Sequence, residues 1–263
     1  MKKYTAKYFR DNIPEWKWKK ETILGALFYR RVSFYTAAFL ANHNVSANTV
    51  SYLSGLVGLI GSALFLLPYR SAHIIGAILF NIWIIMDCTD GNLARNVKKQ
   101  PFGEFADGLG SYILVAFMGS MIGVAAYFEG GLLIDAGCPW IILLGALGST
   151  SDTLMRLIYQ KYKATEIELA NKKVIEISKD ERLDHSKDRG WKMRLETEFG
   201  IGGILPFLTL VLSIFGYLDI IVFYIFTYYG LSCLAVYYVY VRKAIAASKK
   251  YADKMPHLEE NCK

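Results

Sequence analysis

Long apolar stretches alternate with short polar connections along most of the chain. Six of these stretches reach or approach the length of about 20 residues that crosses about 30 Å of hydrocarbon. They cover residues 49–67, 71–86, 108–128, 138–159, 200–216 and 219–241. The second is short, but it continues into a polar helical segment, as expected if protein rather than lipid covers its end. The pattern predicts an all-α, polytopic membrane protein with six transmembrane helices.

The connections at residues 68–70, 129–138 and 216–219 are short, which predicts a compact antiparallel bundle. A long charged segment precedes the first apolar stretch, so we do not expect a cleavable signal peptide. Three regions are predicted: a cytoplasmic N-terminal segment (1–48), a six-helix transmembrane domain (49–245) and a cytoplasmic tail (246–263). The transmembrane domain includes a charged, helical cytosolic excursion at residues 161–199.

The distribution of positive charge predicts the orientation. The chain has 30 Lys and Arg against 23 Asp and Glu, and 29 of the 30 basic residues fall on alternate connections, leaving only Arg70 on the other side. The positive-inside rule then places both termini in the cytoplasm, in a cell inner membrane or an endoplasmic reticulum membrane. No basic stripe remains to follow a phosphate backbone, so nucleic-acid binding is excluded. The four cysteines are too scattered for a disulfide framework.

Residues 27–41 precede the first apolar stretch and mix aromatic and aliphatic side chains with Arg30 and Arg31. This composition predicts an amphipathic helix lying in the plane of the lipid headgroups. The alternative is an ordinary amphipathic helix packed on the bundle.

Three carboxylates stand where a membrane helix should have none. Asp87 and Asp90 follow the second apolar stretch on one helix face, and Asp107 lies at the start of the third. Each such charge costs about 2.5 to 3.5 kcal/mol at mid-bilayer, and less near the interface. If the two antiparallel helices point these side chains at one another, they form an oxygen-only site suited to Mg²⁺, Mn²⁺ or Ca²⁺. The alternative is that the acids simply pair with Arg95 and the two lysines that follow it.

Small residues accompany these acids. Gly91, Ala94, Gly103, Gly108 and Gly110 are predicted to leave space beside the carboxylates for a closely approaching ligand. A divalent cation, carboxylates and free space together suggest a site for a pyrophosphate group.

The run from Asp87 to Arg95, followed by Gly103 and Asp107, resembles the DxxDGxxAR…GxxxDxxxD signature of the CDP-alcohol phosphotransferases. The resemblance implies a six-span, homodimeric membrane enzyme. Such an enzyme moves a phospho-alcohol or phosphatidyl group from a CDP-linked donor to a hydroxyl acceptor and releases CMP, in phospholipid or lipid-headgroup biosynthesis. It also implies one or two bound Mg²⁺ or Mn²⁺ ions, which would neutralise the leaving group and orient in-line attack.

Residue by residue, the resemblance assigns Asp87, Asp90 and Asp107 to metal binding. Gly91, Ala94 and Gly103 would make room for the cytidine nucleotide, and Arg95 would lie near its phosphates. These assignments cover the positions that match the signature.

One signature position departs from the family. Ser111 stands where the family has its fourth Asp, which is taken as a metal ligand and as the base for the acceptor. A serine hydroxyl is a weak ligand and no base near neutral pH. Glu104 lies seven residues before Ser111, about 10.5 Å along a helix, so it would serve as a base only for an acceptor entering from the cytoplasmic end. A base elsewhere or an already anionic acceptor are further options.

Arg156 is a basic residue near the cytoplasmic end of the fourth stretch. It is either a clamp for an acceptor phosphate or donor headgroup, or a partner of Asp152. Two alternatives to an active transferase also remain: a relative that binds CDP compounds without turnover, and a carrier whose buried acids bind a transported cation.

Overall fold

A computed structural model describes residues 3–19, 21–176 and 197–252 of the protein. The regular structure of these residues is all helical, which confirms the predicted fold class. In chain order the helices are α1 (Ala6–Asp11), α2 (Glu15–Lys19), the π-helical turn η1 (Gly25–Tyr29), α3 (Arg30–Asn42), α4 (Ala47–Leu64), α5 (Arg70–Asn96), α6 (Gly103–Glu129), α7 (Trp140–Asn171), α9 (Leu205–Phe215) and α10 (Leu218–Lys250).

Five helices, α4, α5, α6, α7 and α10, are long and apolar enough to cross a membrane. The fifth predicted stretch, 200–216, forms only the 11-residue α9, about 16 Å long. Turns precede it, since the Gly203 N–H donates to the Gly200 carbonyl at 3.0 Å, and Gly216 ends it with a φ of +77°. A count of six full-length spans therefore stays a prediction. The charged segment predicted at 161–199 begins as a continuation of α7, and residues 177–196 lie outside the described residues.

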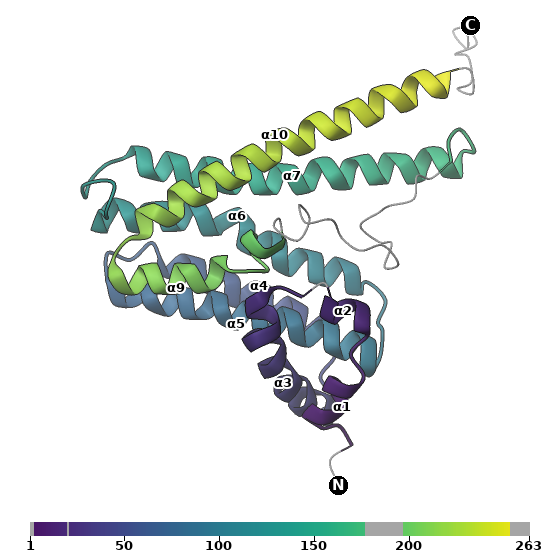
Figure 1. The fold of residues 1–263 in the computed structure, drawn as a ribbon, viewed down its shortest axis with the longest axis horizontal. Helices are drawn as coiled ribbons and strands as arrows, with labels where there is room; N and C mark the ends of the chain where they lie inside the picture. Colours follow the sequence, from purple (N-terminus) through teal and green to yellow (C-terminus); the bar gives the residue numbers. More distant parts are fainter. Residues whose placement is uncertain (1–2, 20, 177–196, 253–263) are drawn as a thin grey trace, which may run out of the picture.

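The long helices run roughly along the long axis of the molecule, and the short N-terminal helices run across it (Figure 1). α7 and α10 lie side by side, and α6 packs against α7 on one side and α4 on the other. α4 also packs along α5, whereas α5 and α6 contact each other far less. The small N-terminal helices gather at the end where α5 turns into α6 (Figure 1). α4 therefore packs against both helices that carry the signature acids, α5 and α6.

Glycines allow the closest helix crossings. A Cβ atom at Gly110 of α6 would lie 2.9 Å from the Ser51 carbonyl oxygen and from Ser54 Oγ of α4. A Cβ at Gly145 of α7 would lie 2.3 Å from the Gly119 carbonyl oxygen of α6. Small residues at such crossings let membrane helices approach each other closely. Gly110, expected to leave ligand space, instead serves the contact between α4 and α6.

We expect Gly110→Ala to lower the stability of the folded protein by about 1 to 3 kcal/mol, because its methyl group would force α4 away from α6. The thermal unfolding temperature of the detergent-purified protein measures this effect. Gly230→Ala is the matched control, since a Cβ at that helical glycine of α10 meets no atom within 4 Å. Equal unfolding temperatures for the two variants would contradict the packing role.

A cluster of polar residues lies at the end of the bundle away from the turn between α5 and α6. His73 of α5 is fully buried, with Nδ1 2.6 Å from a Glu129 carboxylate oxygen and Nε2 2.6 Å from the Leu67 carbonyl oxygen. Arg70, the one basic residue predicted on this side, contacts the other Glu129 oxygen at 3.3 Å. These contacts tie the turn between α4 and α5 to the end of α6.

Residues 27–41 fall on η1 and α3. Phe34, Ala37 and Ala41 of α3 are buried. Tyr35 and Phe39, on the other face, are 71% and 60% exposed. The helix therefore packs on the bundle with an aromatic face left open, and its position relative to lipid headgroups stays a prediction.

Candidate active site

The reversal between α5 and α6 brings the acidic residues of both helices to one end of the bundle. α5 ends at Asn96, and the backbone N–H groups of the next two residues donate to the Leu93 carbonyl at 2.9 and 3.2 Å. Phe102 then adopts a left-handed conformation with a φ of 59°, and α6 begins at the following residue. Asp107 lies on the second turn of α6 as a result, beside the last turns of α5.

The three signature acids are neighbours but not equivalent. The carboxyl groups of Asp87 and Asp107 are close enough for a direct side-chain interaction, and Asp90 is within electrostatic range of both. Asp90 Oδ2 accepts a hydrogen bond from Ser51 Oγ at 2.5 Å. Within the described part of the chain, no three His, Cys, Asp or Glu side chains are arranged as a ready metal-binding group. The structure thus shows a carboxylate pair, with a third acid held one turn away.

Accessibility increases along this group of acids. Asp90 is only 6% exposed, Asp87 is half-buried and Asp107 is exposed. A ligand from solvent therefore reaches the acids from the Asp107 side, while Asp90 forms the closed end.

Ser51 is a site residue that the sequence did not point out. It lies on α4, 39 residues before Asp90, and is buried at 3% exposure. The signal available in the sequence was the small and polar face of the first apolar stretch, with Ser51, Ser54, Gly55 and Gly58 at helical spacing. That face was compatible with close packing against any other helix.

The predicted nucleotide-binding residues border the acids. The Arg95 guanidinium folds back over Gly91, where a Cβ would lie 2.9 Å from Nη2, and donates a hydrogen bond to Asn92 Oδ1 at 3.4 Å. A Cβ at Gly103 would meet only Asn48 Oδ1, at 3.6 Å, so the space beside Gly103 is open. Ala94 is half-buried on the same stretch of α5.

Ser111 and Glu104 lie on α6 on either side of Asp107. Ser111 is half-buried one turn beyond Asp107, and Glu104 is exposed in the first turn of the helix. The exposed carboxylate therefore stands at the open end of the site, and the hydroxyl group stands deeper in the bundle.

Arg156 makes its described contacts with residues of α7 and α6 other than the signature acids. Its Nε contacts the buried Asp152 carboxylate at 2.8 Å, one turn earlier on α7. The guanidinium carbon lies 5.9 Å from the centre of the Tyr112 ring, and Gln160 donates to the Tyr112 hydroxyl at 2.9 Å. These side chains line a cavity of about 320 Å³ between α6, α7 and α10. The pairing with Asp152 that the sequence offered as one alternative is present.

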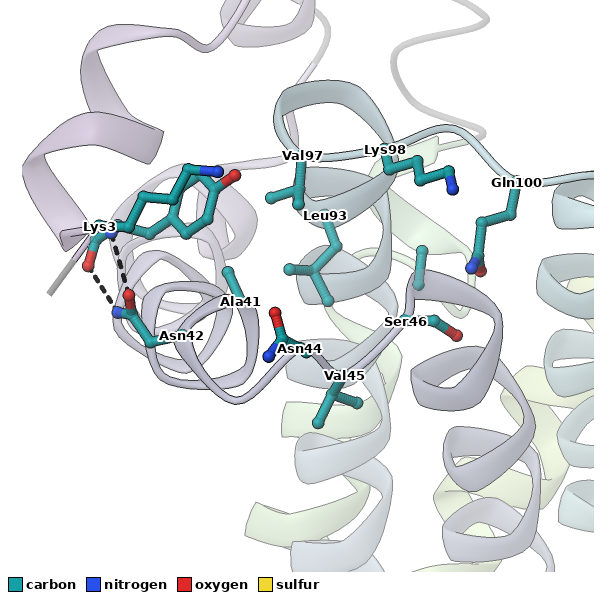
Figure 2. Close-up of a pocket in the computed structure, with 12 residues that line it drawn as sticks. Lys3, Ala41, Asn42, Asn44, Val45, Ser46, Leu93, Val97, Lys98 and Gln100 are labelled. Atoms are coloured by element: carbon teal, nitrogen blue, oxygen red, sulfur yellow. Dashed lines mark hydrogen bonds between the residues drawn. The ribbon is translucent and has the colours of Figure 1, made fainter.

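A second cavity, of about 370 Å³, opens between α3, the start of α4 and the end of α5 (Figure 2). Its polar lining residues include Lys3, Asn42, Lys98 and Gln100, and its lining contains no carboxylate. None of the site residues predicted from the sequence lines it. This cavity is therefore separate from the acidic group.

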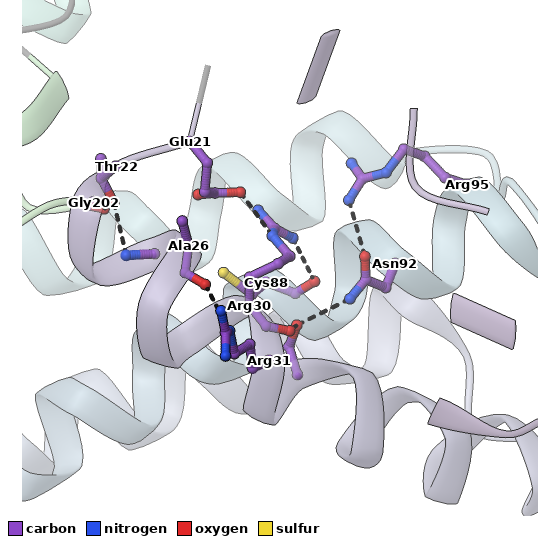
Figure 3. A network of polar contacts seen from close by, with 11 residues as sticks. Glu21, Thr22, Ala26, Arg30, Arg31, Cys88, Asn92, Arg95 and Gly202 are labelled. Atoms are coloured by element: carbon purple, nitrogen blue, oxygen red, sulfur yellow. Dashed lines mark hydrogen bonds and ion pairs between the residues drawn. The ribbon is translucent and has the colours of Figure 1, made fainter. Parts of the chain in front are cut away.

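An N-terminal arm, residues 3–42, packs against the signature segment of α5. Arg30 pairs with Glu21 at 2.7 Å, with the two side chains 4% and 9% exposed, and donates to the Cys88 carbonyl at 3.2 Å (Figure 3). Burial and the neighbouring Arg30 guanidinium lower the pKa of Lys17 on α2. Burial also raises the pKa of Tyr29 to about 12. The arm thus places several buried polar groups next to the site.

Five long apolar helices with an acidic group at one end define an integral membrane protein. A family model for CDP-alcohol phosphatidyltransferases matches residues 44–186, more than half of the 263 residues. The chain belongs to this family, whose members transfer a phosphatidyl group in lipid biosynthesis and generally use divalent metal ions. They bind a CDP-alcohol donor and an alcohol acceptor and lie in a lipid bilayer. No curated protein matches the chain.

Proposed function

We propose that this protein is a metal-dependent transferase that moves a phosphatidyl or phospho-alcohol group from a CDP-linked donor to a hydroxyl acceptor and releases CMP. The reaction would take place at the cytoplasmic end of the bundle, with both termini on that side. The protein would act as a homodimer, as the family resemblance implies.

The observation that carries this proposal is the meeting of Asp87 and Asp107 from two different helices. Two carboxylates close together repel each other, so the arrangement favours a bound cation. Family membership and the oxygen-only donor set both support a hard divalent ion.

Asp87 and Asp107 would hold Mg²⁺ or Mn²⁺, with Asp90 as the third carboxylate of the set. When bound, the ion would supply Lewis-acid stabilisation of negative charge on the phosphates. Ser51 keeps Asp90 in place, because its hydroxyl donates to the carboxylate at 2.5 Å. The exposed side of Asp107 gives the donor access from solvent.

The remaining signature residues would bind the donor. Arg95, folded over Gly91, presents its guanidinium beside the acids, where it would contact phosphate oxygens. Gly103 and Ala94 would border the cytidine. The acceptor hydroxyl would attack the phosphorus next to the lipid or alcohol group, and the bond to the CMP oxygen would break. Arg156 would contact the acceptor or the donor headgroup from α7.

A second candidate function has a specific observation behind it. Ser111 offers no base at the family's fourth acidic position, and Glu104 lies at the outer end of the site. A relative that binds CDP compounds without turnover would show the same structure. The two functions differ in whether CMP is released.

Purified protein should release CMP from at least one member of a panel of CDP-linked donors when paired with hydroxyl acceptors. We expect release with Mg²⁺ or Mn²⁺ and none with a chelator, since the carboxylates alone do not neutralise the phosphates. Chromatographic detection of CMP measures the reaction. Binding of CDP-linked donors without any CMP release would support the second function, and activity in the chelator would rule out the metal-dependent one.

A further inference from the structure

The N-terminal arm is held on α5 by polar contacts at four positions along that helix. Each contact joins one arm side chain to a group on the part of α5 that leads into or contains the signature. The contacts are Tyr29 to Asn81 at 2.5 Å, Arg30 to Cys88 at 3.2 Å, Thr36 to Thr89 at 2.6 Å and Asn92 to Ser33 at 2.9 Å. The arm therefore has a defined position relative to the acids, although the family match begins only at residue 44.

The segment between α2 and α3 is also fixed. The Glu21–Arg30 ion pair is almost fully buried, so its geometry constrains the chain just after α2 (Figure 3). The Trp18 ring of α2 packs edge-on against Phe34 of α3, with 6.2 Å between ring centres. Together these contacts fix α2 against α3 and hold Glu21 and Arg30 beside the signature segment of α5.

Lys17 is the residue that this arrangement brings to the site. It lies within electrostatic range of Asp87 and Asp107. It also lies within range of Arg30 and Arg95, which repel it, and of Glu21, which attracts it. Its ammonium group makes no ion pair or hydrogen bond with any residue in the described ranges. Lys17 therefore lies near the two acids without contacting either of them.

Arg95 is in a similar position. Within the described part of the chain, its side chain donates a hydrogen bond to the neutral amide of Asn92 and not to a carboxylate. Arg30, in contrast, is neutralised by Glu21. Two cations close enough to repel each other, next to acids that neither contacts, would be stabilised by a group with several negative oxygens. A diphosphate has this chemistry.

We propose that Lys17 of the N-terminal arm binds the diphosphate of the CDP-linked donor together with Arg95. This inference rests on the proposed function and adds to it a binding residue from outside the signature. The donor site is then complete only when the arm is docked on α5. Arg30 acts as a positioning residue, because it holds the arm through Glu21 and Cys88 rather than facing the ligand.

Lys17→Gln tests the proposal with isothermal titration of CDP and of cytidine into the purified full-length protein in Mg²⁺ buffer. A charge-assisted contact to phosphate is worth enough that its loss should weaken CDP binding about tenfold. Cytidine, which has no phosphate, should bind equally to both proteins. Lys17→Arg should retain most of the affinity for CDP.

Lys19→Gln is the matched control, since Lys19 lies on the same short helix, is exposed and pairs with Glu15 at 2.7 Å. CDP affinity equal to wild type in Lys17→Gln would overturn the inference and leave the proposed function intact. Equal losses for CDP and cytidine would also overturn it, because they would indicate a structural role. A wild-type protein that does not bind CDP would overturn both proposals.

Discussion

Asp90→Asn is expected to reduce metal-dependent CMP release by at least about 10³-fold, because a bound metal ion contributes several kcal/mol to such reactions. The substitution removes the charge but keeps an oxygen that accepts the hydrogen bond from Ser51 Oγ. The packing of α4 on α5 should therefore survive. The rate of CMP release, measured beside the unfolding temperature and the gel-filtration profile, separates loss of chemistry from loss of fold.

Asp135→Asn is a suitable control for this experiment. Asp135 is exposed in the connection between α6 and α7, at the end of the molecule away from the signature acids. The Asp135→Asn variant should release CMP at the wild-type rate. Wild-type activity in Asp90→Asn would remove Asp90 from the mechanism, and an unfolded variant would show that Asp90 is needed for packing.

Ser111→Asp is expected to raise the rate of CMP release by about 10²-fold, the lower range for a correctly placed general base. The position is half-buried one turn beyond Asp107, so a carboxylate there would sit within the site rather than in bulk solvent. It would accept the proton of the attacking hydroxyl. Initial rates at saturating donor and acceptor, for wild type and variant side by side, measure the effect.

Ser111→Ala is the control for the Ser111→Asp variant, since it removes the hydroxyl group without adding a base. We expect Ser111→Ala to keep the wild-type rate. A large loss in Ser111→Ala would show that the hydroxyl itself takes part. Turnover found only in Ser111→Asp would mean that the natural chain binds CDP compounds without transferring a group. No gain in Ser111→Asp would place the base elsewhere, and Glu104→Gln would then test the exposed carboxylate.

Much of the fold could be predicted because membrane-spanning helices have a strong sequence signal. An apolar run of sufficient length satisfies its own backbone hydrogen bonds and needs no partner to be recognised. α5 also continues through the polar signature, as expected for an end covered by protein. The short α9 was harder to predict, since composition alone does not show where turns at Gly200–Gly203 interrupt an apolar stretch.

The site could be predicted only in part. Spacing within one helix placed Asp87 and Asp90 on one face, and the short turn placed Asp107 nearby. Spacing says nothing about which helix lies opposite. Ser51 on α4 contacts Asp90, and Lys17 on α2 lies within electrostatic range of Asp87. Both are 39 or more residues away in sequence, so no local pattern revealed them. Gly110 was predicted to leave space for a ligand because its spacing does not show that α4 packs against it.

By itself, the sequence determined the helical membrane character of this protein, the acidic signature and the absence of a fourth acid at Ser111. These features depend on residue type and on spacing along one helix. The tertiary structure decided which groups surround the acids: α4 packs against both α5 and α6, Ser51 donates a hydrogen bond to Asp90, and the N-terminal arm brings Lys17 within electrostatic range of Asp87 and Asp107. The physical reason is that close packing selects helix neighbours by the shape of whole faces, and a linear pattern does not contain that information.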